Sequence, residues 1–272
     1  MQGFSKLASG TDLFILGIRA AALDVSSSPC SPMNPNGQVS PSRTFYRLGS
    51  VCCIYYVVAQ LIQEITFHLG LDGSATGQAE ILQRLMPLDQ FRQVLILLGF
   101  SFIPIMTAYA GVALRRYHLR PAASVLGLGF AFGFVGTEVS IRAIDLFLVS
   151  RNWAVQYQAA ASETIRQEIA GRIQVWDESV GALYFALLGA HLLSSVCFAM
   201  AIWDSNDKWS LVAAVGFGLT AIECAGRILE GYLGQTWLSG ANYAAYFPIV
   251  FLSLGALAVW LWRQAPSASV KR

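Results

Sequence analysis

The stretch that decides the fold is residues 121–149, PAASVLGLGFAFGFVGTEVSIRAIDLFLV, in which Glu138, Arg142 and Asp145 are the only charged residues. A helix of about 20 residues, rising about 1.5 Å per residue, crosses the roughly 30 Å hydrocarbon core of a bilayer. The run does not alternate between polar and apolar residues, as a strand of a membrane barrel does. We therefore predict a transmembrane helix here.

Other apolar runs along the chain meet the same criterion. Composition agrees, because 55% of the residues are hydrophobic and 12% are charged, whereas about a quarter are charged in soluble domains. We predict an all-α, polytopic transmembrane bundle of six helices in the inner or plasma membrane, with the lipid bilayer as its main partner. The predicted spans are residues 46–70, 93–114, 121–149, 179–203, 209–233 and 242–262.

Basic residues set the predicted orientation. One set of Lys and Arg residues falls at alternate ends of the runs, on the side that the positive-inside rule assigns to the cytoplasm. This set contains Arg43, Arg47, Arg115, Arg116, Arg120, Lys208, Arg263, Lys271 and Arg272. Both termini are therefore predicted to be cytoplasmic. The net charge of only +2 shows no nucleic-acid footprint.

The predicted domain organisation follows from these spans. Residues 1–44 form a cytoplasmic tail with a short amphipathic segment and a Ser- and Pro-rich linker, residues 45–263 form the six-helix membrane domain, and residues 264–272 form a second tail. An external amphipathic insertion is predicted at about 151–177, as a lid or as a packed surface segment. Its apolar residues recur at helical spacing: Ile165, Ile169, Ile173 and Trp176.

A charged motif occurs twice, with a displacement of 85 residues. Both copies have the spacing Glu-x-x-x-Arg-x-x-acid, which places three charges on one helix face and lets the Arg reach both acids. The copies are Glu138, Arg142 and Asp145 in the third helix and Glu223, Arg227 and Glu230 in the fifth. The repeat indicates a duplicated hairpin (helices 2–3 and 4–5), with chance or a common packing solution as the alternative.

Small residues continue these charged faces. Gly127 and Ala131 lie on the third helix and Gly216 on the fifth, so we expect the backbones of these two helices to pack closely. Two short connections, residues 115–120 and 204–208, predict antiparallel neighbours.

Three acids are expected at one depth. Counted from the cytoplasmic ends of their helices, Glu64, Glu138 and Glu223 lie on the order of 20 Å or more into the layer, in its outer half. His68 lies one turn from Glu64 on the same face. His191 should lie deeper, and we interpret it as a hydrogen-bonded histidine of the bundle.

Charges inside a membrane are costly and are expected to be paired and to face the bundle interior. Five acids and two arginines leave three excess carboxylates, so we predict an acidic outer-half pocket that binds a proton, a cation or a small cationic ligand. The candidate residues are Glu64, His68, Glu138, Arg142, Asp145, Glu223, Arg227 and Glu230, with Asp177, Glu178 and Tyr184 as secondary members.

Two alternatives stay open. In one, intrahelical ion pairs make the chain a structural or assembly subunit. In the other, the chain is an intramembrane enzyme that acts on a lipid or isoprenoid, with Glu64 and His68 or the repeated acids as general acid and base. The five cysteines have neither Cys-x-x-Cys spacing nor a nearby His cluster. We predict neither a metal nor a cofactor.

Three features resemble an uncharacterised bacterial family, a six-helix membrane domain of unknown function. They are the Tyr-Arg-Leu-Gly start of the first span at 46–49, the polar Trp-bearing turn at 204–209 and the Gly/Ala-rich later helices. The resemblance covers roughly residues 44–263. It implies the six-helix fold and carries no catalytic residues.

Overall fold

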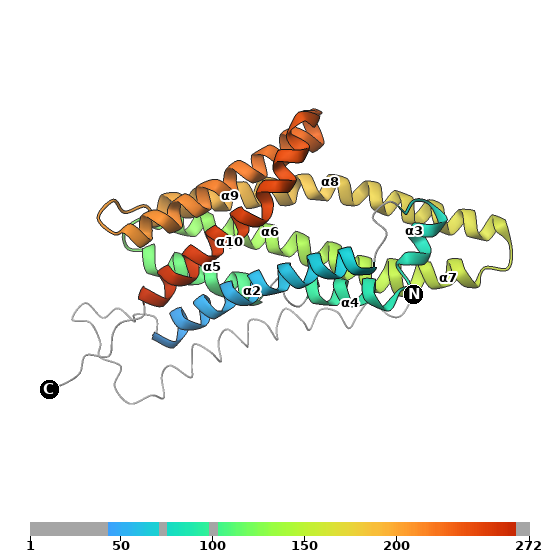
Figure 1. The fold of residues 1–272 in the computed structure, drawn as a ribbon, viewed down its shortest axis with the longest axis horizontal. Coiled ribbons are helices and arrows are strands. Elements are labelled where there is room, and N and C mark those ends of the chain that lie inside the picture. Colours follow the sequence, from blue (N-terminus) through green and yellow to red (C-terminus); the bar gives the residue numbers. More distant parts are fainter. Residues whose placement is uncertain (1–42, 71–74, 98–102, 265–272) are drawn as a thin grey trace. The chain divides into compact units, whose positions relative to one another are not determined.

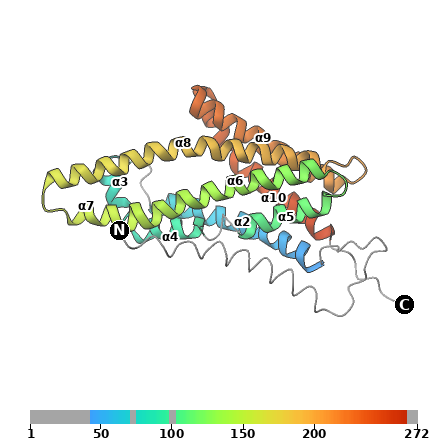
Figure 2. The ribbon, with the colours of Figure 1, turned by 180° about the vertical axis from the view of Figure 1, so that it is seen from behind.

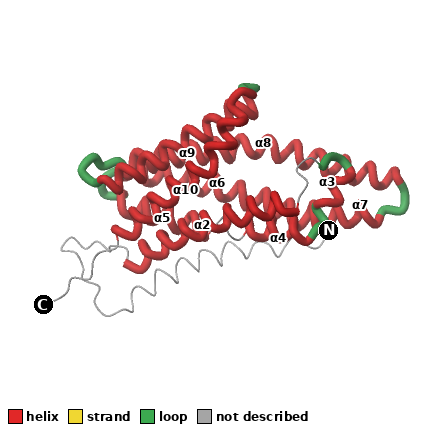
Figure 3. Tube along the Cα trace, in the orientation of Figure 1, coloured by secondary structure: helices red, strands yellow, loops and turns green. Residues whose placement is uncertain are grey.

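The computed structural model describes residues 43–70, 75–97 and 103–264, and all regular structure in these ranges is helical, as predicted (Figures 1 and 3). Most of the chain is therefore accounted for by long helices and short connections. The elements are α2 (Arg43–Gly70), α3 (Gln78–Gln83), α4 (Pro87–Leu95), α5 (Ile103–Arg116), α6 (Pro121–Ile144), η3 (Asp145–Trp153), α7 (Ala154–Ala159), α8 (Glu163–Ile202), α9 (Lys208–Leu233), η4 (Thr236–Leu238) and α10 (Ser239–Gln264).

Five helical segments of the described ranges are long and apolar enough to cross a membrane. The chain is accordingly a multi-pass helical membrane protein. The five are Arg43–Thr66, Pro121–Ala159, Glu163–Ile202, Lys208–Leu233 and Thr236–Gln264.

The expected second span, residues 93–114, is not among these five. Residues 98–102 lie outside the described ranges, and α5 has 14 residues, which cover about 21 Å. The count of six spans therefore stays a prediction. Residues 1–42 and 265–272 also lie outside the description, so the tails and the orientation stay predictions.

Six helices contact one another in a closed ring. The order around the ring is α2, α5, α6, α8, α9 and α10, and α10 returns to α2. The two short connections join α5 to α6 and α8 to α9, and each pair packs together, as predicted. Figures 1 and 2 show α6 and α8 running side by side in both views.

The small residues of α6 and α9 face other helices than expected. A Cβ added at Gly127 would lie 3.0 Å from the ring of Phe198 and 3.2 Å from Cys197, both in α8. A Cβ added at Gly216 would lie 2.7 Å from the Cα of Ser253 in α10. The glycines do permit close approach, but the expected α6–α9 partnership is wrong because α8 stands between these helices in the ring.

Residues 151–177 extend two long helices and do not form a separate insertion. The π-helix η3 and then α7 continue α6, and α8 has 40 residues, a length of about 60 Å that is twice the bilayer core. Ile169 and Ile173 are buried in a second apolar cluster with Val149 and Tyr157, whereas Ile165 is exposed. Of the two roles expected for this segment, a lid or a packed surface, the burial of Ile169 and Ile173 favours packing for these two residues.

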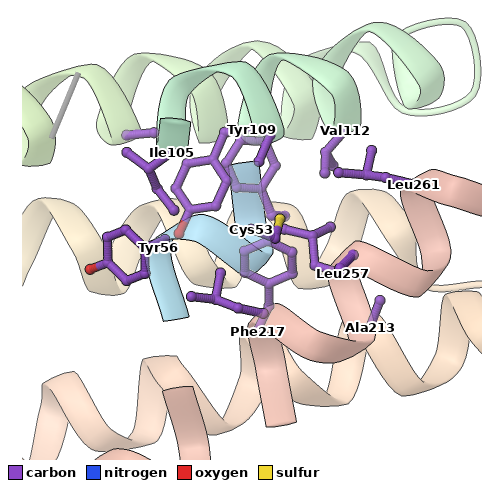
Figure 4. Close-up of a cluster of buried hydrophobic side chains, with 14 of the residues drawn as sticks. Cys53, Tyr56, Ile105, Tyr109, Val112, Ala213, Phe217, Leu257 and Leu261 are labelled. Carbon is purple, nitrogen blue, oxygen red and sulfur yellow. The ribbon is translucent and has the colours of Figure 1, made fainter. Parts of the chain in front are cut away.

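The main apolar core contains buried residues of every helix of the ring. Figure 4 shows Cys53, Tyr109, Phe217 and Leu257 gathered at one place. The ring of Tyr109 lies 5.0 Å from that of Phe198 and 5.7 Å from that of Phe217, measured between centroids. Tilted aromatic contacts of this kind stabilise a core beyond the area that they bury.

Candidate functional site

A cavity of about 270 Å³ lies within the helix ring, and every helix of the ring contributes to its wall. The charged residues of the wall are Glu64, Glu138, Arg142, Glu223 and Arg227. Neutral polar residues accompany them, namely Tyr56, Gln60, Gln63, Tyr184, His191, Thr220, Tyr246 and Ser253.

On α6 and α9 the wall changes from apolar to charged residues along the chain. On α9 the lining residues are Phe217, Thr220, Glu223 and Arg227 in chain order. Glu223 lies 15 residues after the first residue of α9, about 22 Å along the helix. The apolar end of the cavity therefore borders the aromatic core of Figure 4, and the charged end lies farther from the α8–α9 turn.

The charges on α6 (Glu138, Arg142 and Asp145, the α6 triplet) form a network that occupies the arginine. Nε of Arg142 donates to Oε1 of Glu138 at 2.8 Å, and Nη2 donates to the Tyr184 hydroxyl. Nη1 lies 3.8 Å from Oδ2 of Asp145. The side chains of Arg142 and Glu138 are only 16% and 13% exposed, so this pair is well enclosed.

The charges on α9 (Glu223, Arg227 and Glu230, the α9 triplet) are arranged differently. Arg227 forms an ion pair with Glu223, and its guanidinium carbon lies 4.4 Å from the centroid of the Tyr246 ring. The Arg227 side chain is 38% exposed, whereas that of Glu223 is 6% exposed. The Cys224 thiol donates to Oε2 of Glu223 at 3.7 Å.

The third acid of each triplet lies outside the cavity wall. Asp145 accepts a hydrogen bond from Nε1 of Trp176 at 2.6 Å, and Glu230 accepts one from Nδ2 of Asn242 at 2.8 Å. The wall therefore holds three carboxylates and two guanidiniums. If all are ionised, the acid excess is one charge and not the three that were expected.

Of the three secondary candidates, one lines the cavity and two do not. Tyr184 lines the cavity. Asp177 instead accepts two hydrogen bonds from Nη2 of Arg84 at 2.9 and 3.0 Å, and Glu178 accepts one from Gln174 at 3.1 Å. The side chain of His68 lies outside the described part of the structure.

Arg84 lies outside the membrane spans and connects α3 to α8 through its ion pair with Asp177. Burial alone would lower the pKa of Arg84, but the charge of Asp177 and its hydrogen bonds outweigh burial and raise the pKa above its usual value. The guanidinium is therefore a fixed cation at every accessible pH.

Sequence reasoning missed part of the wall. His191, interpreted as a deeper residue of the bundle, lines the cavity and stacks on Phe134 with ring centroids 4.1 Å apart. Its Nδ1 lies 3.5 Å from the sulfur of Cys224. The sequence indicated this position only weakly, because a histidine in an apolar helix is also typical of ordinary packing.

Neutral hydrogen-bonding residues of α2 and α10 were also missed. The Tyr246 hydroxyl donates to Oε1 of Gln60 at 3.1 Å, and Nε2 of Gln60 donates to the Tyr56 hydroxyl at 3.2 Å. The Tyr243 hydroxyl donates to Oε1 of Glu64 at 3.2 Å. Gln60 lies one turn before Glu64, so the face that carries Glu64 did indicate its position.

Within the described residues, no group of three or more His, Cys, Asp or Glu side chains is arranged to hold a metal ion. Comparisons with protein-family models, with curated proteins and with solved structures each found no match. The resemblance to a six-helix bacterial family therefore stays a prediction. What the protein does has to be argued from the cavity.

Proposed function

We propose that the cavity binds a small organic cation and that this binding is the function of the bundle. The observation that carries the proposal is the composition of the wall. Three carboxylates from three different helices, Glu64, Glu138 and Glu223, face one space together with two guanidiniums. These carboxylates would attract a cation into the cavity, and buried charges are favoured when they are paired.

The rest of the wall favours an organic cation over a metal ion. Aromatic rings of Tyr56, Tyr184 and Tyr246 line the charged part, and aromatic faces attract alkylated ammonium groups. Hard metal ions prefer a dense shell of oxygen ligands, and the described residues contain no group of three or more His, Cys, Asp and Glu side chains that could hold one. The apolar end, near Phe217 and Leu257, can hold an apolar substituent.

The volume limits the size of the ligand. Pockets for drug-sized ligands have about 300–1,000 Å³, and this cavity has about 270 Å³. A ligand with one ammonium group and one ring or short chain is therefore the expected size.

One observation favours the structural alternative. Arg142 already contacts Glu138, Asp145 and Tyr184, as expected of a residue that only holds helices together. In that case the cavity would stay empty and the charged residues would affect stability alone. The enzymatic alternative, with Glu64 and His68 as acid and base, stays a prediction without a specific observation in its favour.

The test is ligand-dependent thermal stabilisation of the purified protein in detergent. Benzyltrimethylammonium serves as the cationic probe and phenylacetate as an anion of similar size. We expect the cation, and not the anion, to raise the unfolding temperature, because a ligand that binds the folded state stabilises it. Glu223→Gln should reduce the shift strongly by removing a carboxylate from the wall.

Glu168→Gln is the matched control. Glu168 forms an i,i+4 ion pair with Arg172 at 2.6 Å, in the same spacing as Glu223 and Arg227, but both side chains are exposed and neither lines the cavity. This variant should keep the full ligand shift. Equal shifts for cation and anion, or no shift at any concentration, would reject the proposal.

A further inference from the structure

We infer that Arg227 occupies the position in the cavity that the ligand's cationic group takes, and that the ligand is an alkylated ammonium that displaces Arg227 from Glu223 and Tyr246. This inference rests on the proposed function. It adds the chemical class of the ligand's head group and names a residue of the chain that competes with it.

The surroundings of Arg227 are those of a bound ammonium. A carboxylate and an aromatic face are the two groups that recognise alkylated ammonium ions. Arg227 forms an ion pair with Glu223, and its guanidinium lies over the ring of Tyr246, 4.4 Å from the centroid. All three residues line the cavity. A cation from outside the protein would therefore find its best position already filled by a cation of the chain.

Comparison with Arg142 indicates which arginine can leave. Arg142 has a hydrogen bond to Glu138, a hydrogen bond to Tyr184 and a contact with Asp145, and its side chain is 16% exposed. Arg227 is 38% exposed. A long, partly exposed arginine can move its charged head toward water while its stem stays against the protein. Arg227 is therefore the exchangeable cation of the two.

The exchange of Arg227 for an ammonium ion also keeps the charge of Glu223 paired. Glu223 is 6% exposed, and a buried carboxylate that loses the cation paired with it is strongly destabilised. If an ammonium ion arrives as Arg227 departs, Glu223 keeps a cationic partner throughout. The exchange thus needs no protonation of the acid.

The decisive measurement is the dissociation constant of benzyltrimethylammonium for variants at position 227, measured by calorimetric titration in detergent. Arg227→Gln removes the competing cation, so we expect binding about tenfold tighter than in the parent protein, roughly the effect of losing one cation–π contact and its ion pair. Arg172→Gln, at the matched exposed pair with Glu168, should leave the dissociation constant unchanged. Weaker or unchanged binding by Arg227→Gln overturns the inference.

A lysine variant separates displacement from a simple change of charge. Arg227→Lys keeps the cavity charge but lacks the planar guanidinium that stacks on Tyr246. We expect it to compete less well, so binding should tighten about threefold. The variant also covers the case in which Arg227→Gln fails to fold. Binding equal to or weaker than that of the parent protein counts against displacement.

Variants of Tyr246 test the shared aromatic face. Tyr246→Phe keeps the ring and loses the hydrogen bond to Gln60, so it should bind the probe nearly as well as the parent. Tyr246→Leu removes the ring and should weaken binding about tenfold in the Arg227→Gln background, where no internal cation interferes. Equal binding by the phenylalanine and leucine variants contradicts the assignment.

The results distinguish the inference from the proposed function. If the parent protein and Arg172→Gln bind no ammonium probe, the proposed function fails and the inference fails with it. If the parent binds the probe in a Glu223-dependent way but Arg227→Gln binds it less well, only the displacement inference fails.

Discussion

The α6 and α9 triplets share one spacing and differ in their neighbours. In both, a glutamate and an arginine four residues apart form an ion pair. Arg142 also contacts the hydroxyl of Tyr184 and the carboxylate of Asp145. Arg227 instead lies over the ring of Tyr246 and is partly exposed. The same local motif can therefore hold a bundle together in one helix and offer an exchangeable charge in another.

The largest expected effect comes from the two arginines. Arg142→Gln leaves Glu138 and Asp145 without their shared cation in an enclosed position, and breaking a buried pair in this way costs about 3–5 kcal/mol. Arg227→Gln should cost clearly less, because its side chain is more exposed. Thermal unfolding in detergent measures both variants, and a larger loss for Arg227→Gln would invert the comparison.

The next largest loss of stability is expected at a small residue of α9 that has an equivalent small residue in α6. With the offset of the repeat, Gly216 of α9 corresponds to Ala131 of α6, and a methyl group at 216 would lie 2.7 Å from the Cα of Ser253. Gly216→Ala should therefore destabilise the protein by about 1–3 kcal/mol through overpacking. Gly218→Ala is the control, because a Cβ there meets nothing within 4 Å. If both variants unfold at the same temperature, the close α9–α10 contact is wrong.

A smaller effect is expected at the third acids. Trp176→Phe removes the donor to Asp145, which is 7% exposed, and a buried acceptor left without a donor costs about 1–3 kcal/mol. Asn242→Ala removes the donor to Glu230, a half-buried residue, so the loss should be below about 1 kcal/mol. The order of the two unfolding temperatures checks this difference.

Another small effect is expected at the starts of the two helices. Asp207 caps α9 by accepting from the Trp209 amide, and Ser210 donates to its other oxygen, whereas α6 begins at Pro121 without a side-chain cap. The hydrogen bond from Ser210, with those from the backbone, lowers the pKa of Asp207 below its usual value. Asp207→Ala should cost about 1 kcal/mol at pH 7.

The pH dependence of this cap has a definite sign. Because the pKa of Asp207 is lower in the folded state, the ionised carboxylate stabilises the fold above its unfolded pKa of about 4. The difference between the parent and Asp207→Ala should therefore shrink as the pH falls below about 4. A difference that grows in acid would contradict the cap.

The sequence predicted what depends on local geometry. The i,i+4 spacing predicted both Glu–Arg ion pairs, and the spacing of Ile169 and Ile173 predicted that their segment is helical. Neither result needs knowledge of the neighbouring helices, because both follow from 3.6 residues per turn.

The sequence did not predict what depends on the order of the helices. Gly127 and Gly216 were given the wrong partners because no local pattern shows that α8 stands between α6 and α9. The acid excess was too high for the same reason, since Trp176 and Asn242 come from other helices to bind Asp145 and Glu230. Residues 163–177 are largely polar, so the sequence did not indicate that they belong to the same helix as the apolar residues after them.

The central claim is that the cavity binds an organic cation beside Glu223. The most direct test is an experimental structure of the protein with 4-iodobenzyltrimethylammonium, in which the iodine is located by its anomalous scattering. We expect one iodine position at the apolar end, near Phe217 and Leu257, with the ammonium next to Glu223 and Tyr246. Iodine found only outside the helix ring, or none at saturating ligand, would contradict it.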